Sequence, residues 1–140
     1  MTTLASPAII LTAAVTVLTA LVMVYTFVLV GRMRGKHGIN APAMSGHPDV
    51  ERALRVQGNT VEQVVIFLPL LWVAALYFPG WWAPAFGAVW CVGRVVYAVG
   101  YMKAPASRST GFFISSIATI ALLVLSVIGL VQAWMASAAV

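Results

Sequence analysis

The chain has 140 residues, of which 62% are hydrophobic and 8% are charged, whereas soluble domains usually carry roughly 25% charged residues. This composition excludes an ordinary soluble domain, and the net charge of +5 does not indicate nucleic-acid binding because no basic run is interleaved with aromatic residues. The single cysteine, Cys91, excludes a disulfide framework and a cysteine-rich metal site, and we expect it to be inert packing.

The first apolar segment, residues 8–30, is long enough to cross a hydrocarbon core about 30 Å thick. It lacks a preceding basic region and is too long for a typical signal-peptide core, so we expect a retained transmembrane helix. The basic run of residues 31–36 ends it, and a Gly- and Pro-rich loop leads to the second segment. His37 and His47 lie too far in sequence from an acid or cysteine partner to predict a metal site, so we interpret them as solvated loop residues.

The second segment, residues 50–77, begins beside Pro48 and Asp49, a proline and a negative charge that favour the first turn of a helix. Pro69 lies inside it and predicts either a kink or a break that neighbouring helices accommodate. Residues 78–82 form a short turn with two tryptophans, which is typical of a membrane interface.

The third and fourth segments cover residues 83–102 and 112–133. All eight basic residues belong to the side of the first and third connections: Arg32, Arg34, Lys36, Arg52, Arg55, Arg94, Lys103 and Arg108. The positive-inside rule therefore predicts that these connections face the cytoplasm and that both termini lie on the opposite side. We expect residues 1–140 to form one all-α membrane domain, a four-transmembrane-helix bundle.

Polar residues form a stripe along the second segment. Arg52, Arg55, Asn59 and Glu62 are separated by three, four and three residues, which places them on one face of a helix. A charge at bilayer depth costs at least about 2.5–3.5 kcal/mol unless a partner or a water-filled cavity receives it. The stripe therefore predicts a polar partner elsewhere in the chain.

The third segment carries the matching stripe, formed by Arg94, Tyr97 and Tyr101. A tight turn joins the two segments, so we expect antiparallel neighbours. One register sets three pairs level: Glu62 with Arg94, Asn59 with Tyr97, and Arg55 with Tyr101. Two interpretations remain open: the first pair is a structural ion pair and the tyrosines pack in the bundle, or these residues bind a ligand.

The cytoplasmic ends of the segments have an excess of positive charge. Only Asp49 and Glu51 balance a cluster formed by Arg52, Arg55 and Arg108, with Arg32 or Arg34 from the first connection. Snorkelling to lipid phosphates accounts for some of these arginines. An anionic ligand with carboxylates accounts for the whole cluster better, because the guanidinium fork binds a carboxylate through two hydrogen bonds.

The run Glu51-Arg52-x-x-Arg55-x-x-x-Asn59-x-x-Glu62, followed by Arg94-x-x-Tyr97-x-x-x-Tyr101 and by Arg108, resembles the MAPEG family, the membrane-associated proteins in eicosanoid and glutathione metabolism. The resemblance is to the branch of microsomal glutathione transferases and cysteinyl-leukotriene synthases, and it covers the whole chain. It implies a homotrimer of four-helix subunits with a glutathione site in each subunit interface, open to the cytoplasmic side.

The resemblance also implies roles for single residues. Arg55, Asn59 and Glu62 of one subunit would contact glutathione, together with Tyr97, Tyr101 and Arg108 of the neighbour; Arg32 or Arg34 would join them, and Arg94 would support Glu62 or bind the ligand directly. Free thiols titrate near about pH 8.5, so a guanidinium at Arg108 would favour the thiolate. The thiolate would then attack a lipophilic electrophile that enters from the bilayer.

Two positions depart from the family pattern. Gln63 stands where several relatives place a tyrosine, and the proline of the second segment is displaced to Pro69. The first departure argues against a leukotriene-specific site. We expect a glutathione transferase, with reduction of lipid hydroperoxides as a further activity. The alternatives are a glutathione-dependent isomerase, a non-catalytic membrane binding protein and a small transporter, although residues 8–30 lack the acidic residue that such exporters typically need.

Overall fold

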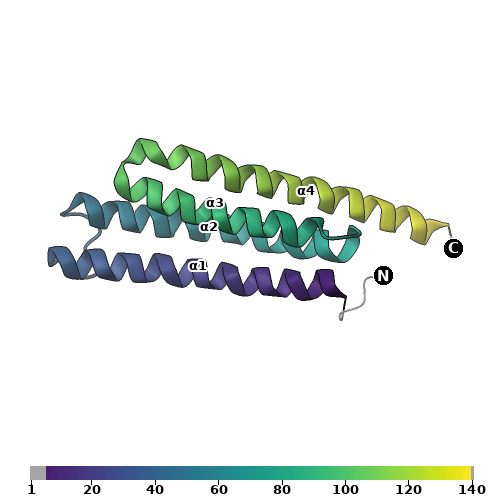
Figure 1. Cartoon of the computed structure of the whole chain (residues 1–140), viewed down its shortest axis with the longest axis horizontal. Coiled ribbons are helices and arrows are strands. Elements are labelled where there is room, and N and C mark those ends of the chain that lie inside the picture. Colours follow the sequence, from purple (N-terminus) through teal and green to yellow (C-terminus); the bar gives the residue numbers. More distant parts are fainter. Residues whose placement is uncertain (1–5, 140) are drawn as a thin grey trace.

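The computed structural model describes residues 6–139, which form four long helices. They are α1 (Pro7–His37), α2 (Pro48–Tyr77), α3 (Trp82–Lys103) and α4 (Ser109–Ala138), and a short 3₁₀ turn, η1 (Pro105–Arg108), precedes α4. The helices lie side by side as an elongated bundle (Figure 1). Four helical segments are long and apolar enough to cross a membrane, which confirms the predicted all-α class with four spans.

Helix α1 extends beyond the apolar segment. The side chain of Ser6 caps its first turn and Pro7 occupies the first helical position. We expected the basic run of residues 31–36 to belong to the first connection, but it forms the last turns of α1. Arginine, methionine and lysine are good helix formers, and positive charge is favourable at a helix C-terminus. The helix ends at Gly38, whose positive φ of 65° allows its N–H to bond the carbonyl of Arg34.

Helix α2 begins at Pro48, as predicted. The ring of His47 caps it by accepting the backbone N–H of Asp49. Pro69 is accommodated inside the helix, which continues to Tyr77. Close to this proline, the hydroxyl of Ser126 on α4 donates to the carbonyl of Leu70 at 3.1 Å, so the two helices share a hydrogen bond within the bundle.

The core of the bundle is apolar and closely packed. Phe67 of α2 stacks on Trp90 of α3 with ring centroids 4.0 Å apart. The buried threonines of α1 bond carbonyls of their own helix, so Thr19, for example, adds no unpaired polar group to the core. Cys91 is buried beside the Thr19 hydroxyl at 3.5 Å, in agreement with the packing role expected for it.

Two glycines allow α3 and α4 to approach closely. A Cβ at Gly111 would overlap the backbone of Tyr97, and a Cβ at Gly93 would lie 2.7 Å from the backbone nitrogen of Ser115. Contact between the helices is therefore backbone to backbone, as at other small-residue interfaces in membranes. It fixes η1 and the start of α4 against the C-terminal half of α3.

Large apolar side chains cover the outside of the bundle, including Ile10, Val65, Ile117 and Trp134. Exposed apolar area on this scale is covered by lipid or by other subunits. Together with the four candidate spans, it indicates an integral, multi-pass membrane protein.

Candidate functional site

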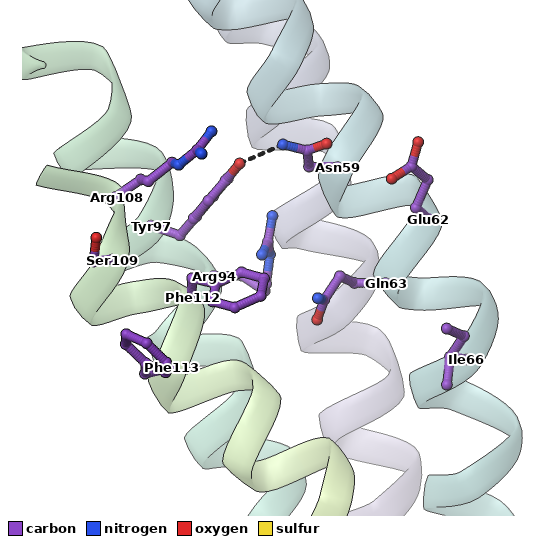
Figure 2. A pocket seen from close by; sticks show the side chains of 10 residues that line it. All are labelled: Asn59, Glu62, Gln63, Ile66, Arg94, Tyr97, Arg108, Ser109, Phe112 and Phe113. Atoms are coloured by element: carbon purple, nitrogen blue, oxygen red, sulfur yellow. Dashed lines mark hydrogen bonds between the residues drawn. The ribbon is translucent and has the colours of Figure 1, made fainter. Parts of the chain in front are cut away.

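A cavity of about 490 Å³ lies between α2 on one side and α3 and α4 on the other. Its lining consists of Asn59, Glu62, Gln63, Ile66, Arg94, Tyr97, Arg108, Ser109, Phe112 and Phe113 (Figure 2). Five of these residues were predicted from sequence as site residues: Asn59, Glu62, Arg94, Tyr97 and Arg108. One chain thus brings together side chains from both predicted stripes.

The level pairing of α2 with α3 is confirmed at the centre of the cavity. The Asn59 amide donates a hydrogen bond to the Tyr97 hydroxyl (Figure 2). The ring of Tyr97 is buried, and its hydroxyl reaches across to α2. Further toward the N-terminal end of α2, Arg55 and Tyr101 line one smaller cavity together, as the same register requires.

Arg94 is buried, with an exposed fraction of 1%. Its Nη2 donates to the hydroxyl of Thr60 at 2.7 Å, and its guanidinium carbon lies 4.0 Å from the centroid of the Tyr97 ring. Its other two nitrogens, Nε and Nη1, are buried and have no hydrogen-bond partner among the described residues. The guanidinium is therefore only partly satisfied at the wall of the cavity.

Of the two interpretations left open for Glu62 and Arg94, the structural ion pair is not formed within the chain. Both residues line the cavity, but their head groups lie apart in Figure 2 and form no ion pair within 4.0 Å. The register of two antiparallel helices determines which residues lie at the same level along the bundle. It does not determine whether the side chains of those residues point toward each other, because that depends on the rotation of each helix about its own axis. Thr60 faces the bundle and is fully buried, whereas Glu62, two residues further on, points to the exposed side of α2.

Arg108 lies at the end of η1, at the edge of the cavity, and is exposed. Its Nη1 donates to the Tyr101 hydroxyl at 3.4 Å, and its guanidinium carbon is 5.3 Å from the centroid of that ring. The carbonyl of Ser107 sits so close to Gly100 that a Cβ there would overlap it, so η1 rests directly on α3. No acidic group lies within ion-pair distance of Arg108 in the part of the chain described.

The arginines of α2 lie outside the main cavity. Arg52 lines the smaller cavity of about 310 Å³, where its Nη1 donates to the carbonyl of Met102 at 3.4 Å and lies 3.8 Å from an Asp49 oxygen. A further cavity of about 450 Å³ opens on another side of α2, and Arg55, Asn59 and Glu62 all contribute to it. The polar stripe of α2 is therefore accessible from two sides in the single chain.

Arg32 and Arg34, in the last turns of α1, do not reach the cavities. Arg34 donates from Nη1 to the carbonyl of Ala43 at 2.7 Å and to that of Ile39 at 3.4 Å, so it braces the first loop. Arg32 is exposed on α1. Neither side chain lines the cavities between α2 and its neighbours.

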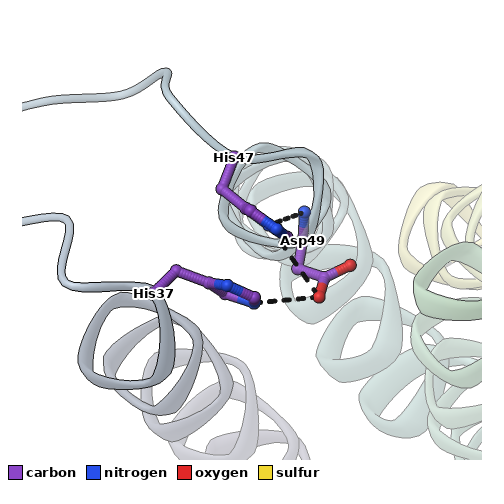
Figure 3. Close-up of side chains that lie close together, drawn as sticks. All are labelled: His37, His47 and Asp49. Carbon is purple, nitrogen blue, oxygen red and sulfur yellow. Dashed lines mark hydrogen bonds and ion pairs between the residues drawn. The ribbon is translucent and has the colours of Figure 1, made fainter.

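The interpretation of His37 and His47 as solvated loop residues was wrong. His37 is the last residue of α1, and its Nε2 lies 3.0 Å from Oδ2 of Asp49. His47 lies at the start of α2 and stacks on His37 with ring centroids 3.4 Å apart (Figure 3). The expectation failed because it placed both residues in the loop and did not consider that the two helix ends would meet.

Sequence reasoning also missed part of the cavity wall. Gln63, Ile66, Phe112 and Phe113 lie next to the predicted polar residues. Gln63 follows Asn59 by four residues and Ile66 follows Glu62 by four residues, so helical spacing alone was a usable signal for both. The phenylalanines belong to α4, whose uniformly apolar sequence does not distinguish a cavity-facing residue from a lipid-facing one.

A model of the MAPEG family matches residues 12–128 of the chain. The chain is 43% identical over 112 residues to an uncharacterized protein of Synechocystis, covering 80% of this chain and 82% of that protein. It is 42% identical over 106 residues to human microsomal glutathione S-transferase 2, covering 76% and 72% of the two chains. It is also 35% identical over 129 residues to leukotriene C4 synthase of Cavia porcellus, covering 92% and 86%.

Proposed function

Because the chain belongs to the MAPEG family, we propose that it is a membrane-bound glutathione transferase. It binds glutathione in the cavity between α2, α3 and α4, favours the thiolate, and joins that thiolate to a lipophilic electrophile. Relatives named glutathione S-transferase and leukotriene C4 synthase support glutathione as the thiol.

The observation that carries the proposal is the partly satisfied guanidinium of Arg94. A buried group that lacks its hydrogen bonds costs about 1–3 kcal/mol, and a charged group costs more. Nε and Nη1 of Arg94 lack partners beside a cavity that also collects Tyr97 and Arg108. An anionic ligand that entered this cavity would supply the missing acceptors, after a small rotation of the guanidinium.

The charges around the cavity match those of glutathione, which carries two carboxylates and one ammonium group. Arg55, Arg94 and Arg108 are candidates for the carboxylates, because none of them is paired with an acid in residues 6–139. Glu62 has no cationic partner within the described chain either, and its exposed carboxylate is available for the ammonium group. Asn59 and Tyr97 would fix the orientation of the peptide part.

We assign thiolate activation to Arg108, held at the cavity edge by its bond to Tyr101. Each unit by which a guanidinium lowers the thiol pKa corresponds to about 1.4 kcal/mol. The thiol proton leaves to solvent, the sulfur forms a bond to the electrophilic carbon, and the electron pair released there moves to a leaving group or takes up a proton. Arg108 forms no ion pair with an acid in the described chain, so its charge is available to the sulfur.

The electrophile would enter from the bilayer. Ile66, Phe112 and Phe113 form an apolar wall next to the polar end of the cavity, and all three are exposed on the outside of the single chain. A lipophilic molecule could lie against this wall while its reactive carbon meets the sulfur. The same thiolate would reduce a lipid hydroperoxide, giving an alcohol and a glutathione sulfenic acid that a second glutathione converts to the disulfide and water.

We further propose that the protein is a homotrimer with its glutathione sites on the cytoplasmic side. The polar stripe of α2 opens to a cavity outside the bundle as well as to the main cavity, and Arg55 and Glu62 are exposed there. A neighbouring subunit would cover these charges, which are unfavourable in contact with lipid. The basic residues at the ends of α1, α2 and α3 support the cytoplasmic orientation.

The proposal is tested by titrating detergent-solubilised protein with glutathione while following the ultraviolet absorbance of the thiolate. We expect a saturable thiolate signal that Arg108→Ala abolishes and that Arg108→Lys, which keeps the charge without the fork, retains in part. Arg32→Ala, outside the cavities, serves as the matched control and should leave a strong signal. Glutathione binding without a thiolate signal would favour a scaffold, and absence of binding would refute the assignment and favour a transporter.

A further inference from the structure

We propose that His37, His47 and Asp49 form a binding site for one divalent transition-metal ion of the Zn²⁺ type, where the end of α1 meets the start of α2. The site is separate from the cavity between α2, α3 and α4, and the proposal does not depend on the glutathione assignment. The three side chains converge in Figure 3.

The geometry of the three ligand atoms carries the proposal. One ring nitrogen of each histidine and one carboxylate oxygen of Asp49 all lie within 4.8 Å of one another. His37 Nε2 is 3.0 Å and His47 Nδ1 is 3.9 Å from Oδ2 of Asp49. Ligand atoms of a tetrahedral zinc ion lie about 3.4 Å apart, given bonds of about 2.0–2.2 Å. These distances bracket that separation.

The donor set selects the class of ion. Two imidazole nitrogens and one carboxylate oxygen suit zinc and neighbouring transition metals, whereas Ca²⁺ and Mg²⁺ prefer oxygen ligands alone. The side chains are partly covered, with exposed fractions of 16% for His37, 38% for His47 and 28% for Asp49. An ion therefore has access from solvent and room for water as a further ligand.

The surroundings set the conditions under which an ion binds. Lys36 lies 3.9 Å and Arg52 lies 3.8 Å from the carboxylate oxygens of Asp49, so a metal ion must displace these cations. The imidazole rings are nearly parallel, at 16°, and an ion lies in the plane of each ring that binds it. The ring of His47 must therefore rotate, which releases the Asp49 N–H that its Nδ1 accepts in the ion-free protein. Both imidazoles must be in the neutral form to bind the ion.

A bound ion would tie the two helix ends together across the first loop. That loop, residues 38–46, is already held by Arg34, whose guanidinium bonds the carbonyls of Ile39 and Ala43. The Glu51 carboxylate accepts the backbone N–H of Gly46 at 3.3 Å. Glu51 is not one of the three proposed metal ligands. We expect a bound ion to add one more link between the two ends of this loop and to leave the membrane-embedded part of the bundle unchanged.

The test uses the full chain, metal-free, in detergent, without glutathione and with any polyhistidine tag removed. The chain contains only two histidines, so chemical modification of histidine reports on this site alone. We expect one equivalent of Zn²⁺ to bind in competition with a chromophoric chelator, and to protect both histidines from modification. Co²⁺ should give the visible absorption of a low-coordinate site with nitrogen and oxygen ligands.

Three variants probe the ligands. His37→Ala, Asp49→Asn and His47→Asn should each weaken Zn²⁺ binding by more than about tenfold, since even outer-shell partners are worth 10–100-fold in affinity. Asparagine at position 47 can still cap α2, so the loss is not caused by unfolding of the helix start. Glu51→Gln, which removes the neighbouring carboxylate, and Cys91→Ser, which removes the thiol, should bind as tightly as the unaltered chain.

The proposal fails if Zn²⁺ affinity is the same in the three ligand variants and the unaltered chain, or if zinc does not protect the histidines. It also fails if Cys91→Ser removes binding. Glutathione binding to the metal-free protein is measured in parallel, so that a failure of the zinc proposal is distinguished from a failure of the glutathione proposal.

Discussion

Individual side chains show how the protein handles charge inside a bundle. Arg94 is held by one threonine hydroxyl and by the face of a tyrosine ring, and no carboxylate of residues 6–139 lies within ion-pair distance of it. A buried charge without a counter-charge is expensive for folding, and such groups in membrane proteins mark functional positions. Asn59 and Tyr97, by contrast, satisfy each other and stabilise the contact between α2 and α3.

The first prediction is that Arg94 lowers the stability of the ligand-free protein and strengthens the binding of glutathione. Arg94→Met should leave the thermal stability of the ligand-free protein unchanged or raised, because it removes two unsatisfied buried nitrogens, each a cost of about 1–3 kcal/mol. The same variant should bind glutathione more than about tenfold more weakly, as measured by calorimetry. A large loss of stability with unaltered binding would show that Arg94 is structural.

Thr60→Val is the companion variant. It removes the hydroxyl that Arg94 bonds and leaves the guanidinium without a hydrogen-bond partner in the described chain. We expect a destabilisation of about 1–3 kcal/mol in the ligand-free protein, partly recovered when glutathione saturates the site. Equal destabilisation with and without the ligand would argue against contact between Arg94 and the ligand.

At the level of elements, backbone contact between α3 and α4 positions the site. Gly111 packs on the backbone of Tyr97, and Gly100 on the carbonyl of Ser107, so η1 and α3 form one rigid corner. Arg108 extends from this corner toward Tyr101. The distance between α3 and η1 therefore decides whether Arg108 reaches the cavity.

The second prediction follows from this packing. Gly111→Ala should destabilise the bundle, because the added methyl group overlaps the Tyr97 backbone and neither side can yield without separating the helices. We expect a loss of at least about 1–3 kcal/mol and a weaker glutathione thiolate signal, since Arg108 moves with η1. Thermal unfolding and the thiolate titration measure the two effects.

Gly35→Ala provides the matched control for that variant. Gly35 lies in α1 with no atom within 4 Å of an added Cβ. Alanine is favoured over glycine inside a helix by about 0.5–1 kcal/mol, so the control should be neutral or slightly stabilised and keep its thiolate signal. Similar losses in both variants would contradict the packing argument.

The whole molecule is a bundle whose outside is apolar and whose basic residues gather toward one end of the helices. The loop between α1 and α2 and the turn at η1 lie together at one end of the bundle, and the start of α1 and the end of α4 lie toward the other (Figure 1). This arrangement gives the predicted orientation a direct test, because one end carries the candidate site and the other does not.

The third prediction is that the first loop faces the cytoplasm. In a Cys91→Ser background, Ser45→Cys should react with a membrane-impermeant thiol reagent from the cytoplasmic side alone. Ser137→Cys, near the end of α4 and exposed, should react from the opposite side alone. Labelling of intact cells and inverted vesicles separates the two, and the reverse pattern would place the candidate site outside the cytoplasm.

Much of this architecture follows from local patterns. The lengths of the apolar segments predicted four spans, and Pro48 with Asp49 predicted the start of α2. The spacing of polar residues predicted which side chains share a height, and the bond from Asn59 to Tyr97 confirms that register. These features depend on helical periodicity and on the length of apolar segments, and both can be recognised from residues that are close together in the sequence.

Only the tertiary structure decided which side chains bond each other at a given level of the bundle. Arg94 bonds Thr60 instead of Glu62 because the packing of α2 turns Thr60 toward the bundle and Glu62 outward. His37 meets Asp49 because α1 continues to position 37 and ends beside the start of α2. Sequence spacing determines height and face within one helix, but the rotation of each helix about its axis depends on contacts with all its neighbours, so it emerges only when the bundle is assembled.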